Sequence, residues 1–297
     1  LLEKSLNTYI VDPMHRTMRK EAIIMQSNGN VIVIANQKGG VGKTTTTENV
    51  GIGLAKEGKK VLLIDFDPQA DLSASLGIRN SDNMEHTICE ALNGTIKDIP
   101  INFDDLIIHH DENVDIIPSN IELADFELKL VSVMSRERIL DMTLEPLRKK
   151  YDVILIDCPP SLGMLTINAL SSADKVLIPV QAQYLPAKGM TKLLGTINKV
   201  QHQINPRIKV LGVAITLANM QTNLAKSTAD TLRENFGNHI NVFDTIIPIG
   251  VKAAEATVVG KSVFEHARDS NVAKAYENLT KEIVRSEKVK LKGNHER

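Results

Sequence analysis

A glycine-rich stretch with a lysine and a threonine run, NQKGGVGKTTTTENV, occupies residues 36–50. Its glycines let the backbone curl tightly and turn N–H groups inward, and the helix-like segment that follows adds the positive end of its dipole. Lys43 can reach β- and γ-phosphates, and the Thr44 hydroxyl can ligate Mg²⁺. The order of apolar run, glycine loop, GKT and helix predicts a phosphate-binding loop, with a threonine-capped glycine turn as the alternative. The predicted nucleotide contacts in this loop are Lys38, Gly39, Gly40, Val41, Gly42, Lys43, Thr44 and Thr45.

Carboxylates close two apolar runs elsewhere in the chain. VLLIDFDPQ, residues 61–69, places Asp65 and Asp67 two residues apart, which is the spacing of side chains on one face of a strand. Open α/β sheets bind ligands at the carboxyl ends of their strands, so one carboxylate can hold a Mg²⁺ shell while the other orients an attacking water. VILIDCPPSLG, residues 153–163, repeats the pattern with Asp157 as a carboxylate for magnesium-bound water. A strand end followed by an Asp-Pro turn is the alternative for the first pair.

Five short apolar runs frame these residues, at 31–35, 61–64, 153–156, 176–180 and 210–215. Each run is rich in β-branched residues and apolar on both alternating faces, which is typical of strands buried on both sides of a parallel sheet. Helix-like segments lie between them, at 43–57, 135–150, 186–204, 223–236 and 270–286. This alternation predicts a three-layer α/β fold, with a mostly parallel twisted sheet and helices on both faces.

The chain of 297 residues divides into three unequal parts. Residues 1–30 precede the first apolar run and end in the turn signal SNGN, so we expect an N-terminal arm with a helix near 13–25. Residues 31–286 carry all of the strand and helix patterns and are expected to form one phosphate-loop domain. The basic stretch 287–297 is expected to be a frayed tail.

Composition excludes several classes of protein. Hydrophobic residues make up 42% and charged residues 24%, which are ordinary globular values. Lys+Arg is 35 and Asp+Glu is 36, so the net charge of -1 argues against a constitutive nucleic-acid binder. With four Tyr, six Phe and no Trp, rows of stacked bases are not expected. No apolar run approaches the ~18 residues of a membrane span, so no membrane partner is expected.

The two cysteines and a histidine-rich run are expected to have structural roles and not catalytic or metal-binding ones. Cys89 and Cys158 lie far apart and form no CxxC pair, which disfavours a disulfide, a zinc site and an iron–sulfur site and favours a reducing cytoplasm. Both are expected to be small buried residues, and a thiolate at Cys158 would abut a carboxylate. The run of His109, His110, Asp111 and Glu112 is a conceivable metal site, but its place between strand-like segments favours a polar turn.

One departure from the general phosphate-loop pattern is informative. Gln37 stands five residues before Gly42, where the pattern has glycine, and Lys38 follows it within KGGVGKT. With this deviant loop the sequence resembles the ParA/MinD branch of P-loop ATPases, and most closely the ParA/Soj-type partition ATPases. The match runs from about residue 31 to 285. It includes DFDPQADLSASLG (65–77), IDCPPSLGMLTINAL (156–170), VLIPVQAQYLPAKGM (176–190) and IIPIGVKAAEA (246–256). The length and the arm also fit Delta-type partition ATPases of Gram-positive plasmids.

The resemblance implies ATP and Mg²⁺ as cofactors and gives individual side chains a role. Lys38 reaches across a homodimer to the partner's nucleotide, where a second cation neutralises charge on the transferring phosphate. A solvated loop lysine is the alternative. Asp67 polarises the attacking water, Asp65 supports magnesium, and Pro248 borders the adenine. Catalysis is assigned to Lys38, Lys43 and Asp67, and the metal to Thr44, Asp65 and Asp157.

The same resemblance implies a nucleotide-driven cycle. ATP binding drives dimerisation, and the dimer binds double-stranded DNA of a plasmid or chromosome without sequence preference. A ParB-type centromere-binding partner then stimulates slow hydrolysis, which separates the dimer and releases the DNA. The protein is expected in the cytoplasm and, when ATP-bound, on the nucleoid. Because pairing two chains doubles a modest basic patch, the net charge of -1 is compatible with switched DNA binding.

Basic residues late in the chain are the expected DNA contacts. Lys252 occupies the place of a family arginine, whereas Gln221 departs from the family at a second arginine place. The other candidates are Lys226, Arg233, Lys274, Lys281 and Arg285. A solvated surface charge is the alternative for each of them.

Four rival classes remain distinguishable. A MinD-type membrane positioner would end in an amphipathic helix, but Val289 and Leu291 stand among lysines. Iron–sulfur relatives need paired cysteines. Lys38 disfavours a metabolic ATP-dependent ligase of the same fold. A non-enzymatic DNA-binding repressor is disfavoured because residues 1–30 show no helix-turn-helix pattern.

Overall fold

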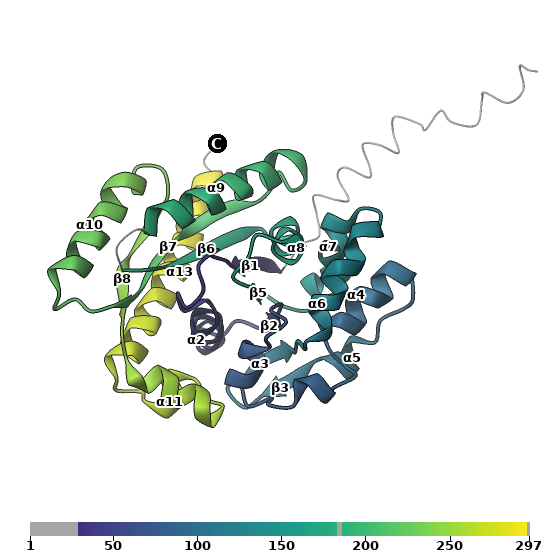
Figure 1. Ribbon diagram of the computed structural model, residues 1–297. Helices are drawn as coiled ribbons and strands as arrows, with labels where there is room; N and C mark the ends of the chain where they lie inside the picture. The colour runs from purple at the N-terminus through teal and green to yellow at the C-terminus, as the bar shows by residue number, and fades with distance from the viewer. Residues whose placement is uncertain (1–28, 183–185, 296–297) are drawn as a thin grey trace, which may run out of the picture.

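The computed structural model describes residues 29–182 and 186–295, and the expected arm lies almost wholly outside this part of the chain. Within it, an eight-stranded sheet runs through the centre of the molecule in the order β3-β4-β2-β5-β1-β6-β7-β8 (Figure 1). All neighbouring strands are parallel except β3 and β4, which are antiparallel. The strands are β1 (Asn30–Ile34), β2 (Val61–Asp65), β3 (Ile108–His110), β4 (Val114–Ile117), β5 (Val153–Asp157), β6 (Lys175–Gln181), β7 (Lys209–Ala218) and β8 (Val242–Pro248).

Helices cover both faces of this sheet, as Figure 1 shows. They are α2 (Lys43–Lys56), α3 (Asp71–Ser75), α4 (Ile88–Lys97), α5 (Phe103–Leu106), α6 (Glu122–Lys129), α7 (Ile139–Leu144), α8 (Met164–Ser172), α9 (Pro186–Gln203), α10 (Asn223–Phe236), α11 (Val251–Val259), α12 (Val263–His266) and α13 (Asn271–His295). Short 3₁₀ turns are η1 (Ser81–Asn83), η2 (Leu130–Ser132), η3 (Arg136–Arg138) and η4 (Leu147–Lys149). The predicted three-layer α/β fold is confirmed.

Period-2 alternation along the strands builds two separate cores. Val31 and Val33 of β1 belong to a core formed with α4, α6, α7, α8, α9 and α10. Ile32 and Ile34 face the opposite core, formed with α2, α3, α11, α12 and α13. Because successive side chains of a strand point to opposite faces, a central strand buried on both sides must be apolar throughout. That is why the five apolar runs marked the central strands.

The structure differs from the sequence prediction in several places. The strand β8 and the hairpin β3–β4 were not among the five predicted strands. The predicted helix 135–150 is broken into η3, α7 and η4, and Pro146 stands where α7 ends, since proline cannot continue the backbone hydrogen bonds of a helix. Helix α13 runs to His295, and the expected fraying of the stretch 287–297 stays a prediction.

Strand order brings the predicted chemistry to one edge of the sheet. Strand β5 lies between β2 and β1, and Asp157 at its end is the register partner of Asp65 and of Ile34. The glycine loop after β1, the loop after β2 and the turn after β5 therefore leave the sheet side by side, at its carboxyl edge.

Candidate nucleotide site

The loop between β1 and α2 has the shape of an anion cradle. Gly40 and Gly42 adopt left-handed backbone conformations, with φ of 67° and 79°. A Cβ atom at either position would meet nothing within 4 Å, so it is the backbone angle, not crowding, that calls for glycine. Gly42 precedes α2, and no side chain caps that helix. No side chain therefore satisfies the backbone N–H groups of its first turn, which is the arrangement that binds anions at a helix N-terminus.

Two buried side chains fix this loop to the sheet. The Asn36 amide donates to the Pro179 carbonyl of β6 at 2.7 Å, and its oxygen accepts from the Lys38 N–H at 3.0 Å. The Thr216 hydroxyl of β7 donates to the Val41 carbonyl at 2.8 Å. Sequence reasoning missed both anchors. A polar residue, Thr216, directly after the apolar run 210–215 was a signal for the second one.

The two lysines of the loop lie in contrasting environments. Lys43 is 7% exposed, whereas Lys38 is exposed and its Nζ lies 3.4 Å from Oε1 of Gln181 in β6. A cavity of about 190 Å³ adjoins Lys38 and is lined in part by Gln181, Asn36 and Gly189. Lys43 therefore belongs to the interior of the site, and Lys38 to its open side.

Thr44 and Asp157 meet as the sequence predicted they would. The Thr44 hydroxyl donates to Oδ2 of Asp157 at 2.6 Å, and the Thr47 hydroxyl donates to Oδ1 at 3.3 Å. Asp157 is fully buried at the end of β5. A hydroxyl next to a carboxylate is a donor set that suits Mg²⁺, which in proteins keeps several waters and takes further oxygens from phosphates. In the described part of the chain, no group of three or more His, Cys, Asp or Glu could hold a metal, so a cation here would depend on such outside oxygens.

Burial raises the pKa of every carboxyl group around Lys43. Desolvation, reinforced by the neighbouring Asp65 carboxylate, raises the pKa of Asp157 to about 8, against the opposing effects of Thr44 and Lys43. Burial raises the pKa of Asp65 to about 7, although hydrogen bonds to Ser73 oppose the shift. Burial also raises the pKa of Asp67, opposed by the Gln69 N–H and Lys43. Lys43 thus opposes the rise at Asp67 and Asp157 without overcoming it, and this shortage of positive charge favours binding of a cation.

Asp65 and Asp67 do not share a strand face, because β2 ends at Asp65. Asp67 lies in the following loop, is 9% exposed, and accepts the Gln69 N–H at 3.1 Å. Asp65 is fully buried and turns towards its own chain. Its Oδ1 accepts the Asp67 N–H at 3.2 Å, and its Oδ2 accepts the Ser73 N–H and hydroxyl at 2.8 and 2.7 Å.

The turn after β5 packs against the glycine loop and against α6. A Cβ atom on Gly39 would lie 3.8 Å from Cβ of Pro160. Oε1 of Glu127 in α6 accepts the Leu165 N–H at 3.2 Å and adjoins Gly163. Glu127 was missed by sequence reasoning, since nothing in its local pattern separates it from a solvated helix residue.

The predicted base contact and DNA contacts are spread over the β7–β8 side of the molecule. Pro248 ends β8 and pairs with Ala218 of β7, two residues past the loop anchor Thr216. Lys226 of α10 and Lys274 of α13 are exposed. The other candidates have acidic neighbours: Lys252 with Glu255 at 2.7 Å, Lys281 with Glu277 at 2.5 Å and Arg233 with Asp230 at 3.9 Å. The role of these residues and of Arg285 in DNA binding stays a prediction.

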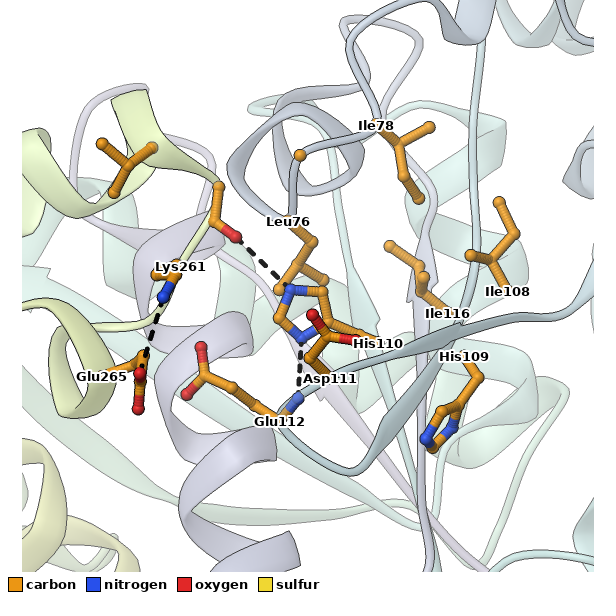
Figure 2. Close-up of a pocket in the computed structure, with 13 residues that line it drawn as sticks. Leu76, Ile78, Ile108, His109, His110, Asp111, Glu112, Ile116, Lys261 and Glu265 are labelled. Atoms are coloured by element: carbon orange, nitrogen blue, oxygen red, sulfur yellow. Dashed lines mark hydrogen bonds and ion pairs between the residues drawn. The ribbon is translucent and has the colours of Figure 1, made fainter.

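Within the described residues, neither the two cysteines nor the histidine run belongs to a group that could hold a metal ion. Cys89 and Cys158 are buried free thiols, and burial raises both pKa values, that of Cys89 to about 12. Figure 2 shows His110 between the Glu112 N–H and the Gly260 carbonyl, at 3.2 and 3.4 Å, in a cavity of about 550 Å³. His109 instead pairs with Asp115 at 2.8 Å. Asp111 and Glu112 lie in the expected polar turn, whereas His109 and His110 belong to strand β3, and His110 holds the β3–β4 hairpin against the end of α11.

A glycine loop opening an uncapped helix, a buried lysine and a threonine–aspartate pair at the carboxyl edge of a mostly parallel sheet define a P-loop ATPase. A family model described as an AAA domain matches residues 29–210. The sporulation initiation inhibitor protein Soj of Bacillus subtilis (strain 168) is 41% identical over 86% of this chain and 98% of that protein. The chromosome-partitioning ATPase Soj of Treponema pallidum (strain Nichols) is 38% identical over 86% of this chain and 97% of that protein.

Solved structures agree with this assignment. The crystal structure described as cobyrinic acid a,c-diamide synthase from Mycobacterium smegmatis, with bound ATP analog and magnesium, superposes with a TM-score of 0.75. It is 33% identical and covers 88% of this chain and 96% of its own. The chain belongs to the ParA/Soj family of P-loop ATPases. Among the described residues, no helix has both the length and the apolar character needed to cross a bilayer. The Delta-type expectation stays a prediction.

Proposed function

We propose that the chain is a DNA partition ATPase that works with ATP and Mg²⁺. The observation that carries the proposal is the convergence of an uncapped helix N-terminus, buried Lys43 and the Thr44–Asp157 pair at one sheet edge. The backbone of residues 38–45 and Lys43 would hold the phosphates, and Thr44 with Asp157 would hold the metal. Magnesium, when bound, supplies a Lewis acid that neutralises phosphate charge. The open space over Gly40 and Gly42 fits such a ligand.

In this proposal, hydrolysis depends on Asp67 and Lys38. Asp67 lies close enough to Lys43 for the ammonium group to oppose the rise in pKa that burial causes. Asp67 would orient the attacking water. Asp65 would support the metal shell indirectly, since its oxygens accept hydrogen bonds from Ser73 and Asp67. Exposed Lys38 would reach the nucleotide of a second copy, and Pro248 would border the adenine.

The proposed cycle joins nucleotide to DNA through dimerisation. ATP favours a homodimer, the dimer binds DNA without sequence preference on the nucleoid, and a ParB-type partner stimulates hydrolysis. Relatives named for chromosome partitioning support this cycle. Two of the candidate DNA contacts already have acidic partners, since Lys252 pairs with Glu255 and Lys281 with Glu277. The affinity for DNA is therefore expected to come from many weak contacts summed over the two copies of the dimer.

The direct test is an ATPase assay with the purified chain and the DNA-binding product of the neighbouring gene. We expect slow turnover alone and stimulation when DNA and that partner are both present. Turnover that responds to neither would overturn the partition function while leaving the ATPase intact. A matched Lys43→Ala variant sets the background of contaminating ATPases.

A second candidate is a metabolic synthase, because one solved neighbour at 33% identity is described as a diamide synthase. The higher identity, 38%, to a relative named as a chromosome-partitioning ATPase favours the first candidate. The two differ in what raises turnover: DNA with a protein partner in one case, a small carboxylic acid acceptor in the other.

A further inference from the structure

The loop that carries Asp67 is held at both ends by one carboxylate. Oδ1 of Asp65 accepts the Asp67 N–H, at the start of the loop, at 3.2 Å. Oδ2 accepts the backbone N–H and the hydroxyl of Ser73, beyond the end of the loop, at 2.8 and 2.7 Å. Asp65 and Ser73 are both fully buried, so water does not compete for these bonds.

Ser73 also joins a third segment to this clamp. Its hydroxyl oxygen accepts the Ser119 N–H, just past the end of β4, at 3.2 Å. The hydroxyl therefore donates to β2 and accepts from the β4 side, and it ties α3 to two neighbouring strands. A methyl group in its place would leave the Ser119 N–H without this acceptor and Asp65 with one donor fewer.

The loop needs such a clamp because its backbone is under strain. Ala70 adopts a left-handed conformation with φ of 55°, which costs a residue with a Cβ atom free energy. The local bonds are the Gln69 N–H to Asp67 at 3.1 Å and the Ala70 N–H to the Asp67 carbonyl at 3.0 Å. These bonds shape the turn but do not fix it to the sheet. The hydrogen bonds between Asp65 and Ser73 fix it there.

We propose that Ser73 is a positioning residue for ATP hydrolysis, which acts through Asp65 to fix the Asp67 loop at the sheet edge. The inference rests on the proposed role of Asp67 in orienting water. Nucleotide binding is assigned to residues 38–45, whereas the hydrogen bonds of Ser73 go to Asp65 and Ser119, so its loss should lower kcat and spare KM. A misplacement of about 1 Å in a catalytic group can cost on the order of 100-fold in rate.

The test compares variants of the full chain at saturating DNA and partner. Ser73→Ala is expected to lower kcat about 10-fold or more and to change the KM for ATP less than about 3-fold. Ser73→Cys, nearly isosteric but a weak donor, should lower kcat as well, and it serves if the alanine variant fails to fold. Ser73→Thr restores the hydroxyl and should recover most of the loss. Ser75→Ala is the matched control: Ser75 lies on the same helix and is 2% exposed, but its hydroxyl donates to the Leu72 carbonyl.

Two further readouts separate positioning from general destabilisation. Hydrogen exchange in a peptide covering 66–76 should be faster in Ser73→Ala than in Ser75→Ala. An unchanged kcat in Ser73→Ala, or an equal loss in Ser75→Ala, overturns the inference. Asp67→Ala is measured in parallel: if it keeps full turnover, the proposed role of Asp67 fails. If it loses turnover while Ser73→Ala does not, only the role of Ser73 fails.

Discussion

Two clusters of charged groups, each built around one buried cation, stand at opposite ends of the same sheet. At the amino end, Arg148 of η4 binds Asp174 at 2.9 Å and Asp141 at 3.5 Å, and Asp141 also binds Arg138 at 3.0 Å. Two cations there meet two anions. At the carboxyl end, Asp65, Asp67 and Asp157 all have raised pKa values, and buried Lys43 opposes the rise at Asp67 and Asp157.

The difference separates charges that support the fold from charges that await a ligand. The Asp174 carboxylate also accepts the Val31 N–H at 2.9 Å, so the amino-end cluster fixes the start of β1 to η4. The charged groups of this amino-end cluster pair with one another. The carboxyl-end cluster gathers more carboxyl groups beside the glycine loop than its one lysine can keep ionised, and in our account a bound metal and nucleotide complete it.

The largest expected effect is on turnover when Lys38 is removed. Lys38→Ala should lower the rate of hydrolysis by about 1,000-fold or more while sparing most ATP binding, if it acts as a second cation on the transferring phosphate. The control is Lys59→Ala, an exposed lysine beyond the far end of α2. Single-turnover hydrolysis with a separate binding titration checks this prediction. Normal turnover in Lys38→Ala would remove the assigned role of this residue.

Asp67→Ala should come next in size. We expect turnover to fall about 100-fold or more, because the water loses its orienting carboxylate, and the ATP-bound dimer to accumulate on DNA. Sedimentation velocity with and without ATP measures the dimer. A variant that stays monomeric with ATP would count against the proposed cycle.

Breaking the amino-end cluster should affect stability, not chemistry. Arg148→Met leaves Asp174 without its buried cation and should cost about 3–5 kcal/mol of unfolding free energy. Turnover per folded molecule should stay within about 3-fold of the parent. Urea unfolding and active-site titration measure the two quantities. A large loss of turnover with unchanged stability would erase the contrast between the clusters.

A smaller effect is expected of pH on the free energy of unfolding of the nucleotide-free chain. The folded pKa values of Asp65 and Asp157, about 7 and about 8, lie above the ordinary value of 3.8. Between those values the folded chain retains protons that the unfolded chain has lost, so stability should fall as pH rises from about 4 to about 8. Unfolding at several pH values should show this slope, and Asp157→Asn should flatten it. A stability that rises over the same range would contradict the burial of these carboxyl groups.

The sequence predicted the parts of this molecule that depend on local pattern. Runs such as 153–156 are apolar on both faces because β5 is covered by both cores, so the central strands were visible directly. Gly40, Gly42 and the Thr44–Asp157 pair follow from a motif with a fixed backbone shape. Strand β8 escaped detection because its exposure is mixed and Asp244 interrupts its apolar residues.

The missed residues act over long separations in the chain. Asn36 reaches β6 and Thr216 reaches the glycine loop, with partners 143 and 175 residues away. Asp65 was predicted to face magnesium, but its partner Ser73 lies on a helix whose packing no local pattern reveals. Pro146 was visible and breaks the predicted helix 135–150, which shows that a single proline outweighs a helical periodicity.

The central claim is that nucleotide switches DNA binding on. It is tested most directly by measuring the affinity of the chain for a nonspecific duplex with Mg-ATP, with Mg-ADP and without nucleotide, over a series of salt concentrations. The account predicts binding with Mg-ATP alone, and an affinity that falls steeply with salt because phosphate contacts provide it. Equal binding without nucleotide would contradict the account and favour a constitutive DNA-binding protein.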